Sequence, residues 1–299
     1  MDKKKILLTG INGQVGHALQ RQLVGFDCVG LSRQDLDSTN VDMIRRVIRE
    51  IKPDIIINPA AYTAVDKAES EPELAYAINA IAPGVIAEEA GKLGSALIHF
   101  STDYVYDGRK SSAYSELDQV NPISIYGKSK LAGEDAIRTV GIPHLILRTS
   151  WVYGAYGKNF LKTIIRLASE REELGIVADQ FGAPTASISI AEGLQKLLLK
   201  WLPQDEHQTG VYHFTNTGST SWHGFACEIV KQYSAIQRLK VDGKNIKPLT
   251  TADYPTPATR PANSCLNHDK LKSTFGLVLP SWQDGLKSVM KQMTSSSSR

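Results

Sequence analysis

The fold of this chain is decided near its N-terminus by residues 5–16, which read Lys5-Ile6-Leu7-Leu8-Thr9-Gly10-Ile11-Asn12-Gly13-Gln14-Val15-Gly16. The apolar run at residues 5–9 is typical of a strand covered on both faces. Glycines then follow at a Gly-x-x-Gly-x-x-Gly spacing, and an amphipathic pattern predicts a helix over residues 14–23. A strand, a glycine-rich turn and a helix in this order indicate the opening unit of a doubly wound α/β sheet.

The same glycines can bring the backbone close to a ligand. They permit a tight turn beside a diphosphate, while the N-terminus of the helix offers free N–H donors. The spacing differs from the Gly-x-Gly-x-x-Gly fingerprint, and a plain strand-turn-helix connection also favours glycine. Because the loop follows a strand and opens a helix, we predict a dinucleotide site there, formed by Gly10, Asn12, Gly13, Gln14, Val15 and Gly16.

Strand and helix patterns alternate through the first half of the chain. Short apolar runs predict strands at residues 5–9, 28–31, 54–58, 96–101 and 144–148. Amphipathic stretches predict helices at residues 14–23, 41–51, 72–93 and 124–140. This alternation is typical of an α/β fold with a doubly wound parallel (Rossmann) sheet.

The pattern becomes less regular in the second half. Helices are predicted at residues 159–170 and 188–201, and a proline-rich loop at residues 254–261. We therefore predict a dinucleotide-binding domain at residues 1–156, joined by segments returning from the C-terminal half, a smaller and mainly substrate-binding lobe at residues 157–293, and a frayed tail at residues 294–299.

Composition excludes several other classes of protein. The 299 residues are 42% hydrophobic and 22% charged, with a net charge of +3 that is too small and dispersed to suggest nucleic-acid binding. No apolar run is long enough for a membrane span, and the N-terminal run is too short for a secretory signal, so we expect a cytoplasmic protein. The three cysteines and seven histidines show no metal-ligand spacing, so no metal is predicted.

The residues after the second strand bear on the choice of cofactor. Arg33 stands where an acidic residue would otherwise bind the ribose 2′-hydroxyl of NAD, and an arginine can pair with the 2′-phosphate of NADP. Asp37 and Ser38 can hydrogen-bond the adenine or its ribose. We therefore predict NADPH as the cofactor. NADH is left open, because Arg33 could instead be a solvated surface residue.

Tyr126 and Lys130 are four residues apart at the start of a predicted helix and so share one face. A phenol has a pKa of about 10, and a neighbouring ammonium stabilises the phenolate and moves that pKa toward the working pH of an acid-base catalyst. Lys130 can also hold the nicotinamide ribose. An ordinary exposed helix turn is the alternative, so the assignment depends on the residues around this pair.

Polar residues at the ends of other predicted strands supply that context. Thr102 follows the strand at residues 96–101, and its hydroxyl can hydrogen-bond a carbonyl oxygen that gains charge. After the preceding strand come residues that can line the cofactor, namely Ala60, Ala61, Tyr62 and Thr63, with Asn79 on the next helix. Local capping is the alternative for Thr63 and Asn79.

With these motifs the sequence resembles the extended short-chain dehydrogenases over nearly its whole length, and within them the dTDP-4-dehydrorhamnose reductases. The resemblance rests on residues 10–16, 60–69, 101–106, 126–130, 148–153, 179–185 and 260–261. It implies a catalytic triad of Thr102, Tyr126 and Lys130, with Trp151 against the sugar. It implies a substrate site made of Thr102, Asp103, Tyr106, Tyr126, Trp151, Asn159, Gln180 and Arg260.

Departures from related patterns narrow the expected reaction. Ala18 replaces the glutamate that some members use for Mg²⁺ at a dimer contact, and Tyr104 replaces the glutamate of the dehydratases. No Cys or His adjoins the catalytic motifs to act as an epimerising pair, so simple keto reduction is favoured.

The resemblance implies reduction of dTDP-4-dehydro-6-deoxy-L-mannose to dTDP-L-rhamnose, a step of polysaccharide biosynthesis. The expected partner is a dTDP-linked keto sugar, with no nucleic acid or membrane, and a homodimer is left open. The alternatives are reduction of another nucleotide-linked keto sugar and a regulatory subunit like that of methionine adenosyltransferase.

Overall fold

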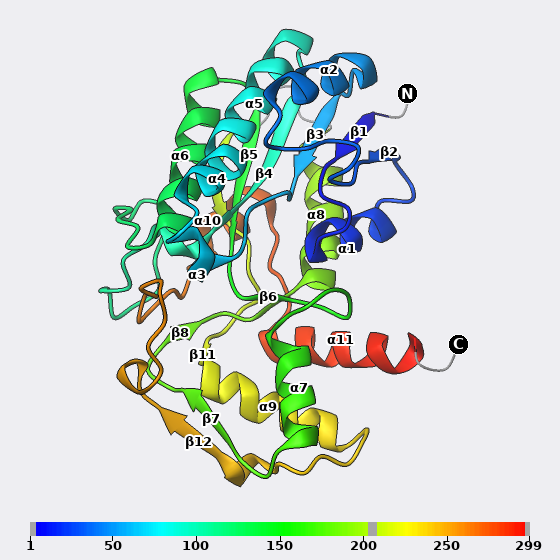
Figure 1. Ribbon diagram of the computed structural model, residues 1–299. Helices are drawn as coiled ribbons and strands as arrows, with labels where there is room; N and C mark the ends of the chain where they lie inside the picture. The colour runs from blue at the N-terminus through cyan, green and yellow to red at the C-terminus, as the bar shows by residue number, and fades with distance from the viewer. Residues whose placement is uncertain (1–3, 203–207, 297–299) are drawn as a thin grey trace.

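A parallel sheet forms the centre of this computed structural model, which describes residues 4–202 and 208–296. Its six strands lie in the order β10-β5-β4-β3-β1-β2 (Figure 1). They are β1 (Lys5–Leu8), β2 (Asp27–Gly30), β3 (Ile55–Asn58), β4 (Ala96–Thr102), β5 (His144–Thr149) and β10 (Gly210–His213). Every neighbouring pair is parallel, which confirms the predicted sheet, whereas β10 was not predicted.

Helices cover both faces of the sheet because successive strand residues point to opposite sides. Ile6 and Leu8 of β1 pack toward one face, and Leu7 packs toward the other. The first face carries α1 (Gln14–Gln22), α8 (Ser187–Trp201) and α10 (Asp269–Phe275); the second carries α2 (Val41–Ile51), α5 (Ala82–Leu93) and α6 (Ile125–Val140).

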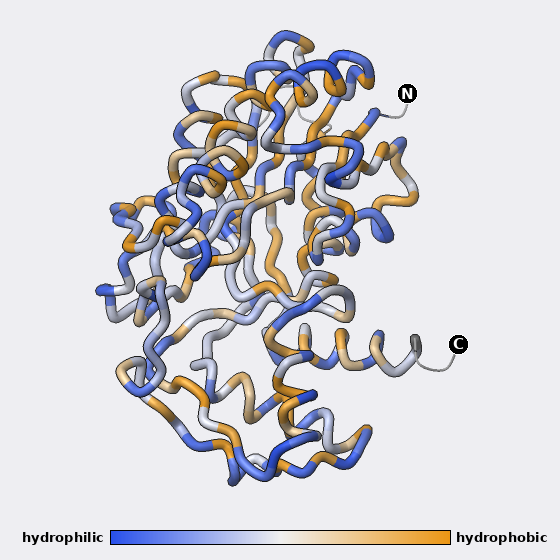
Figure 2. The backbone as a smooth tube through the Cα atoms, viewed as in Figure 1, coloured by the Kyte–Doolittle hydropathy of each residue, from blue (hydrophilic) through white to orange (hydrophobic). Residues whose placement is uncertain are grey.

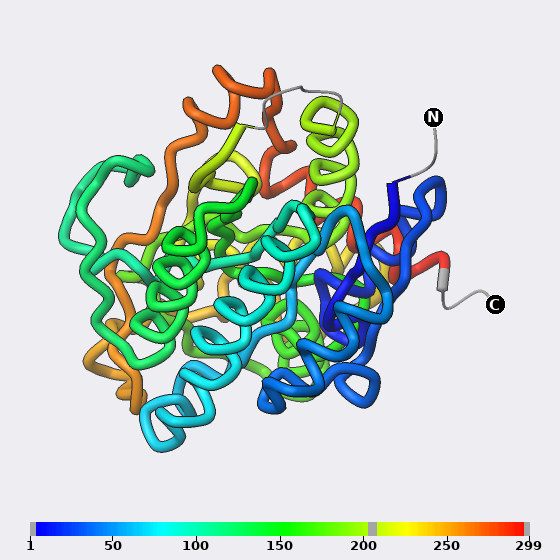
Figure 3. Tube along the Cα trace, turned by 90° about the horizontal axis from the view of Figure 1, so that it is seen from above, coloured from blue at the N-terminus to red at the C-terminus, as the bar shows by residue number. Residues whose placement is uncertain are grey.

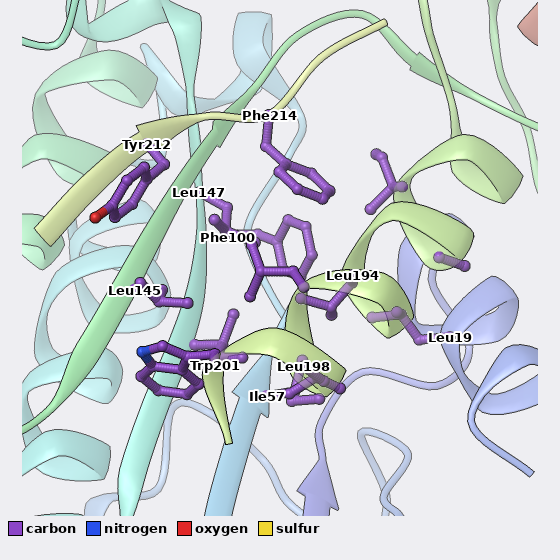
Figure 4. Packing of buried hydrophobic residues seen from close by; sticks show 14 of the residues in the cluster. Leu19, Ile57, Phe100, Leu145, Leu147, Leu194, Leu198, Trp201, Tyr212 and Phe214 are labelled. Atoms are coloured by element: carbon purple, nitrogen blue, oxygen red, sulfur yellow. The ribbon is translucent and has the colours of Figure 1, made fainter. Parts of the chain in front are cut away.

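The core under α8 contains large side chains from several strands. Figure 4 shows Leu194, Leu198 and Trp201 of α8 facing Ile57, Phe100, Leu145 and Leu147 of the sheet. Hydrophobic stretches also run along the central strands in Figure 2. The prediction of burial on both faces is confirmed for β1, β3, β4 and β5, whereas it is wrong for the edge strand β2, whose residues are partly or fully exposed.

The helix predicted at residues 72–93 is interrupted. It consists of α4 (Pro72–Tyr76), a π-helical turn at Ala77–Ile81, and α5. The π-helical turn contains Asn79, and such turns often occur at functional sites.

The smaller lobe has its own hydrophobic core, centred on α7 (Phe160–Glu170), α9 (Trp222–Ser234) and α11 (Trp282–Ser296). Three short strand pairs complete it: β7 (Leu174–Val177) with β12 (Ile246–Leu249), β8 (Phe181–Gly182) with β11 (Thr220–Ser221), and β6 (Val152–Tyr153) with β9 (Thr185–Ala186). Because α8, β10 and α10 return to the large sheet, the C-terminal half contributes to both parts of the molecule.

The two ends of the described chain lie toward one side of the molecule in the view from above (Figure 3). Helix α11 continues to Ser296, so residues 294–296 are helical where a frayed tail was predicted, and residues 297–299 lie outside the described residues. Among the described residues, none of the helices is both long enough and apolar enough to span a membrane.

Candidate active site

The carboxyl ends of β1 and β3 form the entrance to the candidate site. Strand β1 lies between β2 and β3, so the chain leaves β1 toward one side and later returns on the other. Open parallel sheets bind ligands in the crevice created by this reversal. Gly10 has a φ of 61°, and a Cβ added to it would lie 3.0 Å from Ala60 Cα, so the loops after β1 and β3 are in contact there.

The glycine loop is suited to a diphosphate. Gly13 is the N-cap of α1, and no side chain there bonds to the first N–H groups of the helix. A Cβ on Gly16 would lie 2.2 Å from Gly10 O, so only glycine lets α1 start this close to the turn. The residues present therefore fit a dinucleotide with its diphosphate at the N-terminus of α1.

The Gln14 side chain hydrogen-bonds to segments far away in the sequence. Its amide donates to Val152 O at 3.2 Å, and its oxygen accepts from Asn159 Nδ2 at 2.9 Å. Asn159 also donates to Gly154 O and caps α7 by accepting from Lys162 N. These bonds tie the cofactor loop to the smaller lobe and occupy the Asn159 amide, so the structure does not support a substrate contact for Asn159.

The predicted adenosine end of the site is exposed. Arg33 follows β2, is solvent-exposed, and forms no ion pair with the described part of the chain. Asp37 accepts hydrogen bonds from the Thr39 N–H and hydroxyl, and these bonds hold the pKa of Asp37 below its usual value. Arg33 is thus available to an anion, whereas the Asp37 carboxylate already supports the turn before α2.

Asn79 positions the loop after β3 instead of facing a ligand. It is buried, its Oδ1 accepts from Tyr62 N at 2.9 Å, and its Nδ2 donates to Tyr62 O and to Ser129 Oγ. The bonds to Tyr62 hold the backbone of the segment that contains Ala60, Ala61 and Thr63. The predicted contribution of Asn79 to the cofactor site is therefore indirect.

Thr102 and Tyr126 bring two hydroxyl groups together beside the sheet edge. Thr102 ends β4, and its hydroxyl donates to Asp103 Oδ1 at 3.1 Å and accepts from Tyr104 N at 3.2 Å. Burial raises the pKa of Tyr126 to about 12, and hydrogen bonding to the Thr102 hydroxyl opposes that rise. Two hydroxyl groups so placed can both hydrogen-bond to one carbonyl oxygen.

Asp103 is a buried acid next to this pair. Its Oδ2 has no hydrogen-bond partner among the described residues. Burial raises the pKa of Asp103 to about 7, although the Ser264 and Thr102 side chains favour the ionised form. Asp103 is therefore a buried acid whose charged form is disfavoured by its surroundings.

Lys130 lies on the expected helix face but differs from expectation in its contacts. Its side-chain nitrogen donates to Phe100 O at 2.7 Å and lies 3.1 Å from His99 Nε2. Burial lowers the pKa of Lys130 to about 8, against the opposing effect of Glu134. The causes that set the pKa of Tyr126 here are its burial, Thr102 and Asp103, so the effect of Lys130 on Tyr126 stays a prediction.

Close packing fixes the start of α6 and hence the position of Tyr126, the first member of the candidate catalytic pair. Ser124 caps the helix by accepting from Gly127 N. A Cβ on Gly127 would lie 2.2 Å from Tyr104 O, and one on Gly133 would lie 2.0 Å from Asn79 O. These glycines let α6 pack against the segment after β4 and against the π-helical turn, and so place Tyr126 beside Thr102.

Trp151 has an unusual backbone conformation beside the site. Its φ of 46° is rare for a bulky residue and costs free energy. Its ring stacks on Trp222 with 3.5 Å between centroids and an angle of 7°. A Cβ on Gly182 would lie 2.6 Å from the Trp151 ring, so Gly182 leaves the space that the indole fills.

Arg260 connects the proline-rich loop with the large domain. It donates to Oδ2 of Asp66, a residue of α3 (Val65–Ala68), at 2.7 Å, and to the Thr256 hydroxyl within its own loop. Asp66 also accepts from Ala258 N. An anionic substrate would have to compete with Asp66 for Arg260.

Gln180, another predicted substrate residue, is buried, and its side-chain amide donates to Thr251 Oγ1 at 3.1 Å.

Tyr106 belongs to the scaffold, which corrects its predicted substrate contact. It is completely buried, and its hydroxyl donates to Ser115 O, accepts from Arg148 and lies 2.8 Å from His213 Nε2. Arg148 in turn pairs with the buried Glu134. No polar atom of Tyr106 is left to meet a substrate.

Sequence reasoning missed His99, Trp222 and Asp66. His99 carried a signal, since it is a polar residue inside an otherwise apolar predicted strand. Trp222 and Asp66 are recognised only through contacts with residues far away in the sequence. Among the described residues, the structure contains no group of three His, Cys, Asp or Glu residues that could hold a metal ion.

The sequence is similar to a protein-family model and to known reductases over nearly its whole length. The family model described as RmlD substrate binding domain matches residues 4–295. A dTDP-4-dehydrorhamnose reductase from Burkholderia thailandensis is 47% identical over 284 residues, which cover 93% of this chain and 95% of the relative. Another from Escherichia coli (strain K12) is 43% identical and covers 96% of this chain and 97% of the relative. The chain belongs to the dTDP-4-dehydrorhamnose reductase family.

A solved structure places the reductase family's cofactor in the same fold. The dTDP-4-dehydrorhamnose reductase from Bacillus anthracis str. Ames, in complex with NADP, is 41% identical to this chain, with a TM-score of 0.89 and coverage of 97% of this chain and 99% of that one. The predicted fold and family are confirmed, and this member of the reductase family is an NAD(P)H-dependent oxidoreductase.

Proposed function

We propose that this chain reduces the 4-keto group of dTDP-4-dehydro-6-deoxy-L-mannose to give dTDP-L-rhamnose. The observation that carries the proposal is the meeting of the Thr102 and Tyr126 hydroxyls at the end of β4. They lie at the carboxyl edge of the sheet, on the side where the glycine loop fits a dinucleotide. The relatives named above supply the substrate class.

Tyr126, Thr102 and Lys130 each have a separate role in the proposed reduction. When bound, NADPH supplies the hydride that C4 of the sugar receives. The raised pKa of Tyr126, about 12, keeps its hydroxyl protonated at neutral pH, so it can donate a proton to the carbonyl oxygen. Thr102 can donate a hydrogen bond to the same oxygen, and Lys130 provides positive charge for the phenolate that remains.

The other predicted site residues would bind the cofactor and the sugar nucleotide. The cofactor would lie on the loop at residues 10–16 and the segment at residues 60–63, with Arg33 near a 2′-phosphate. Trp151, Asp103, Gln180 and Arg260 would face the sugar nucleotide. The unpartnered, buried Oδ2 of Asp103 supports its place in this set.

A reductase assay tests the proposal directly. Purified protein is offered several nucleotide-linked 4-keto sugars with NADPH and with NADH, and loss of nicotinamide absorbance is followed. Turnover of the dTDP-linked 6-deoxy-L-mannose derivative is expected. Selective turnover of a different sugar would show that the substrate is another nucleotide-linked keto sugar. No turnover of any of the sugars would favour a regulatory role. Light scattering separately tests the homodimer.

A further inference from the structure

Lys130 is held by neutral groups inside the protein. Its Nζ lies 3.1 Å from His99 Nε2 and donates to Phe100 O at 2.7 Å. Both side chains are inaccessible to solvent, with exposed fractions of 1% for Lys130 and 0% for His99. His99 is thus the only side chain that bonds to Lys130 Nζ in the described part of the chain.

A chain of hydrogen bonds continues from His99 to the first strand. His99 Nδ1 lies 3.1 Å from Asn58 Nδ2, and the Thr9 hydroxyl lies 2.6 Å from Asn58 Oδ1. Asn58 and His99 are paired residues on β3 and β4, and Thr9 follows β1 directly before the glycine loop. The chain therefore crosses three neighbouring strands behind the ligand-binding edge.

The nearby carboxylate of Glu134 does not hydrogen-bond to Lys130 Nζ in place of His99. Glu134, one turn along α6 from Lys130, is engaged by Arg148 at 2.6 and 2.9 Å and by Ser101 at 2.6 Å. Glu134 raises the pKa of Lys130, but burial has the larger effect and lowers it to about 8. Burial, together with the charge of Lys130, holds the pKa of His99 well below its usual value, so its imidazole is neutral.

We propose that His99 is a positioning residue for the reduction, because its neutral ring holds the Lys130 nitrogen beside the site and couples the protonation of Lys130 to the chain that ends at Thr9. The role in reduction rests on the proposed function. The hydrogen-bond coupling itself does not need the substrate.

The direction of hydrogen bonding follows from the single N–H of a neutral imidazole. When Lys130 is an ammonium, Nε2 must accept, so Nδ1 carries the proton and donates to the Asn58 amide oxygen. When Lys130 is an amine, Nε2 can donate and Nδ1 accepts from Asn58 Nδ2, the orientation seen here. Each change at Lys130 is therefore accompanied by a change of the His99 tautomer and a turn of the Asn58 amide.

Imidazole ¹⁵N chemical shifts of the full-length protein test this coupling without any substrate. Between pH 6 and 10, His99 is expected to change from the Nδ1–H to the Nε2–H tautomer at the same midpoint as the ¹³Cε resonance of Lys130. His213 is the internal control, since its Nδ1 faces Asn267 O at 2.9 Å and its tautomer should stay constant. A single His99 tautomer throughout the Lys130 titration would overturn the proposal.

Two substitutions test the effect on the reaction. His99→Leu removes the acceptor, so the Lys130 midpoint should fall by about one to two pH units and kcat should fall roughly tenfold to a hundredfold, with the pH profile shifted. His99→Gln, whose amide oxygen can accept from Nζ, should restore much of both. If the leucine variant lowers thermal stability but leaves the Lys130 midpoint and the pH profile unchanged, His99 is only structural.

The outcomes also separate this inference from the proposed function. Coupled titrations in a protein that turns over no keto sugar would refute the reductase assignment and retain the hydrogen-bonded chain. Normal keto-sugar reduction with a fixed His99 tautomer would refute the chain and retain the reductase.

Discussion

Gly182→Ala is a small change with a calculable effect on Trp151. The added Cβ would lie 2.6 Å from Cε2 and 2.8 Å from Cζ2 and Nε1 of the indole. Carbon atoms in favourable contact are about 3.5–4.0 Å apart, so the ring must move by roughly 1 Å. It cannot tilt without loss, because it stacks on Trp222 at 3.5 Å.

Overpacking of this kind costs about 1–3 kcal/mol, and a factor of ten corresponds to about 1.4 kcal/mol. If Trp151 lies against the sugar, KM for the sugar nucleotide should rise roughly fivefold to a hundredfold, while the Kd of NADPH stays within about twofold. Steady-state kinetics and a fluorescence titration measure the two quantities. The change in KM isolates the effect at the sugar side of the site.

Gly243→Ala is the matched control in the same lobe, since a Cβ there meets no atom within 4 Å. It should leave KM and thermal stability unchanged or slightly improved. An unaltered KM in the Gly182→Ala variant would refute the reasoning that Trp151 contacts the sugar. Equal losses in both variants would show that the effect is not specific to the indole.

Four further outcomes are expected. Tyr126→Phe should lower kcat by about 10²–10⁴-fold with near-normal cofactor affinity, measured by single-turnover kinetics and a binding titration. Arg33→Ala should abolish a preference for NADPH in the ratio of kcat/KM values; an unchanged ratio would make Arg33 a plain surface charge. Arg260→Ala should raise KM for the nucleotide sugar roughly tenfold to a hundredfold, unless Arg260 only secures its loop, in which case Tm falls and kinetics do not. Burial raises the pKa of Asp103 to about 7 from 3.8, so the folded state binds this proton more tightly and loses stability as pH rises from about 4 to 7. Asp103→Asn should remove that loss in denaturation experiments at pH 5 and pH 8.

Local sequence patterns were sufficient for the alternating strands and helices and for the candidate catalytic set. Hydrophobic period and glycine spacing are properties of neighbouring residues, so they predict β1, the glycine loop and α1 together. The four-residue spacing of Tyr126 and Lys130 likewise depends only on helix geometry. The family resemblance added roles for Thr102 and Trp151 that spacing alone does not provide.

Contacts between distant segments could not be predicted in this way. Strand β10 joins the sheet through parallel pairing with β5, which lies more than sixty residues earlier in the chain. The same limit explains the misassigned Tyr106, because a tyrosine beside a catalytic motif looks available until Arg148 and His213 are found on its hydroxyl.

The sequence alone determined the α/β class, the glycine loop and the Tyr126–Lys130 spacing, since each is set by the chemistry of adjacent residues. Only the tertiary structure decided where the Lys130 nitrogen bonds, which residues leave Asp103 Oδ2 without a partner, and why Gly182 must be small. Those properties depend on burial and on distances between strands and lobes. The sheet encloses side chains from β3, β4 and α6 in one solvent-free region, where the Lys130 nitrogen must find its partners locally, and the smaller lobe brings Gly182 against the Trp151 ring.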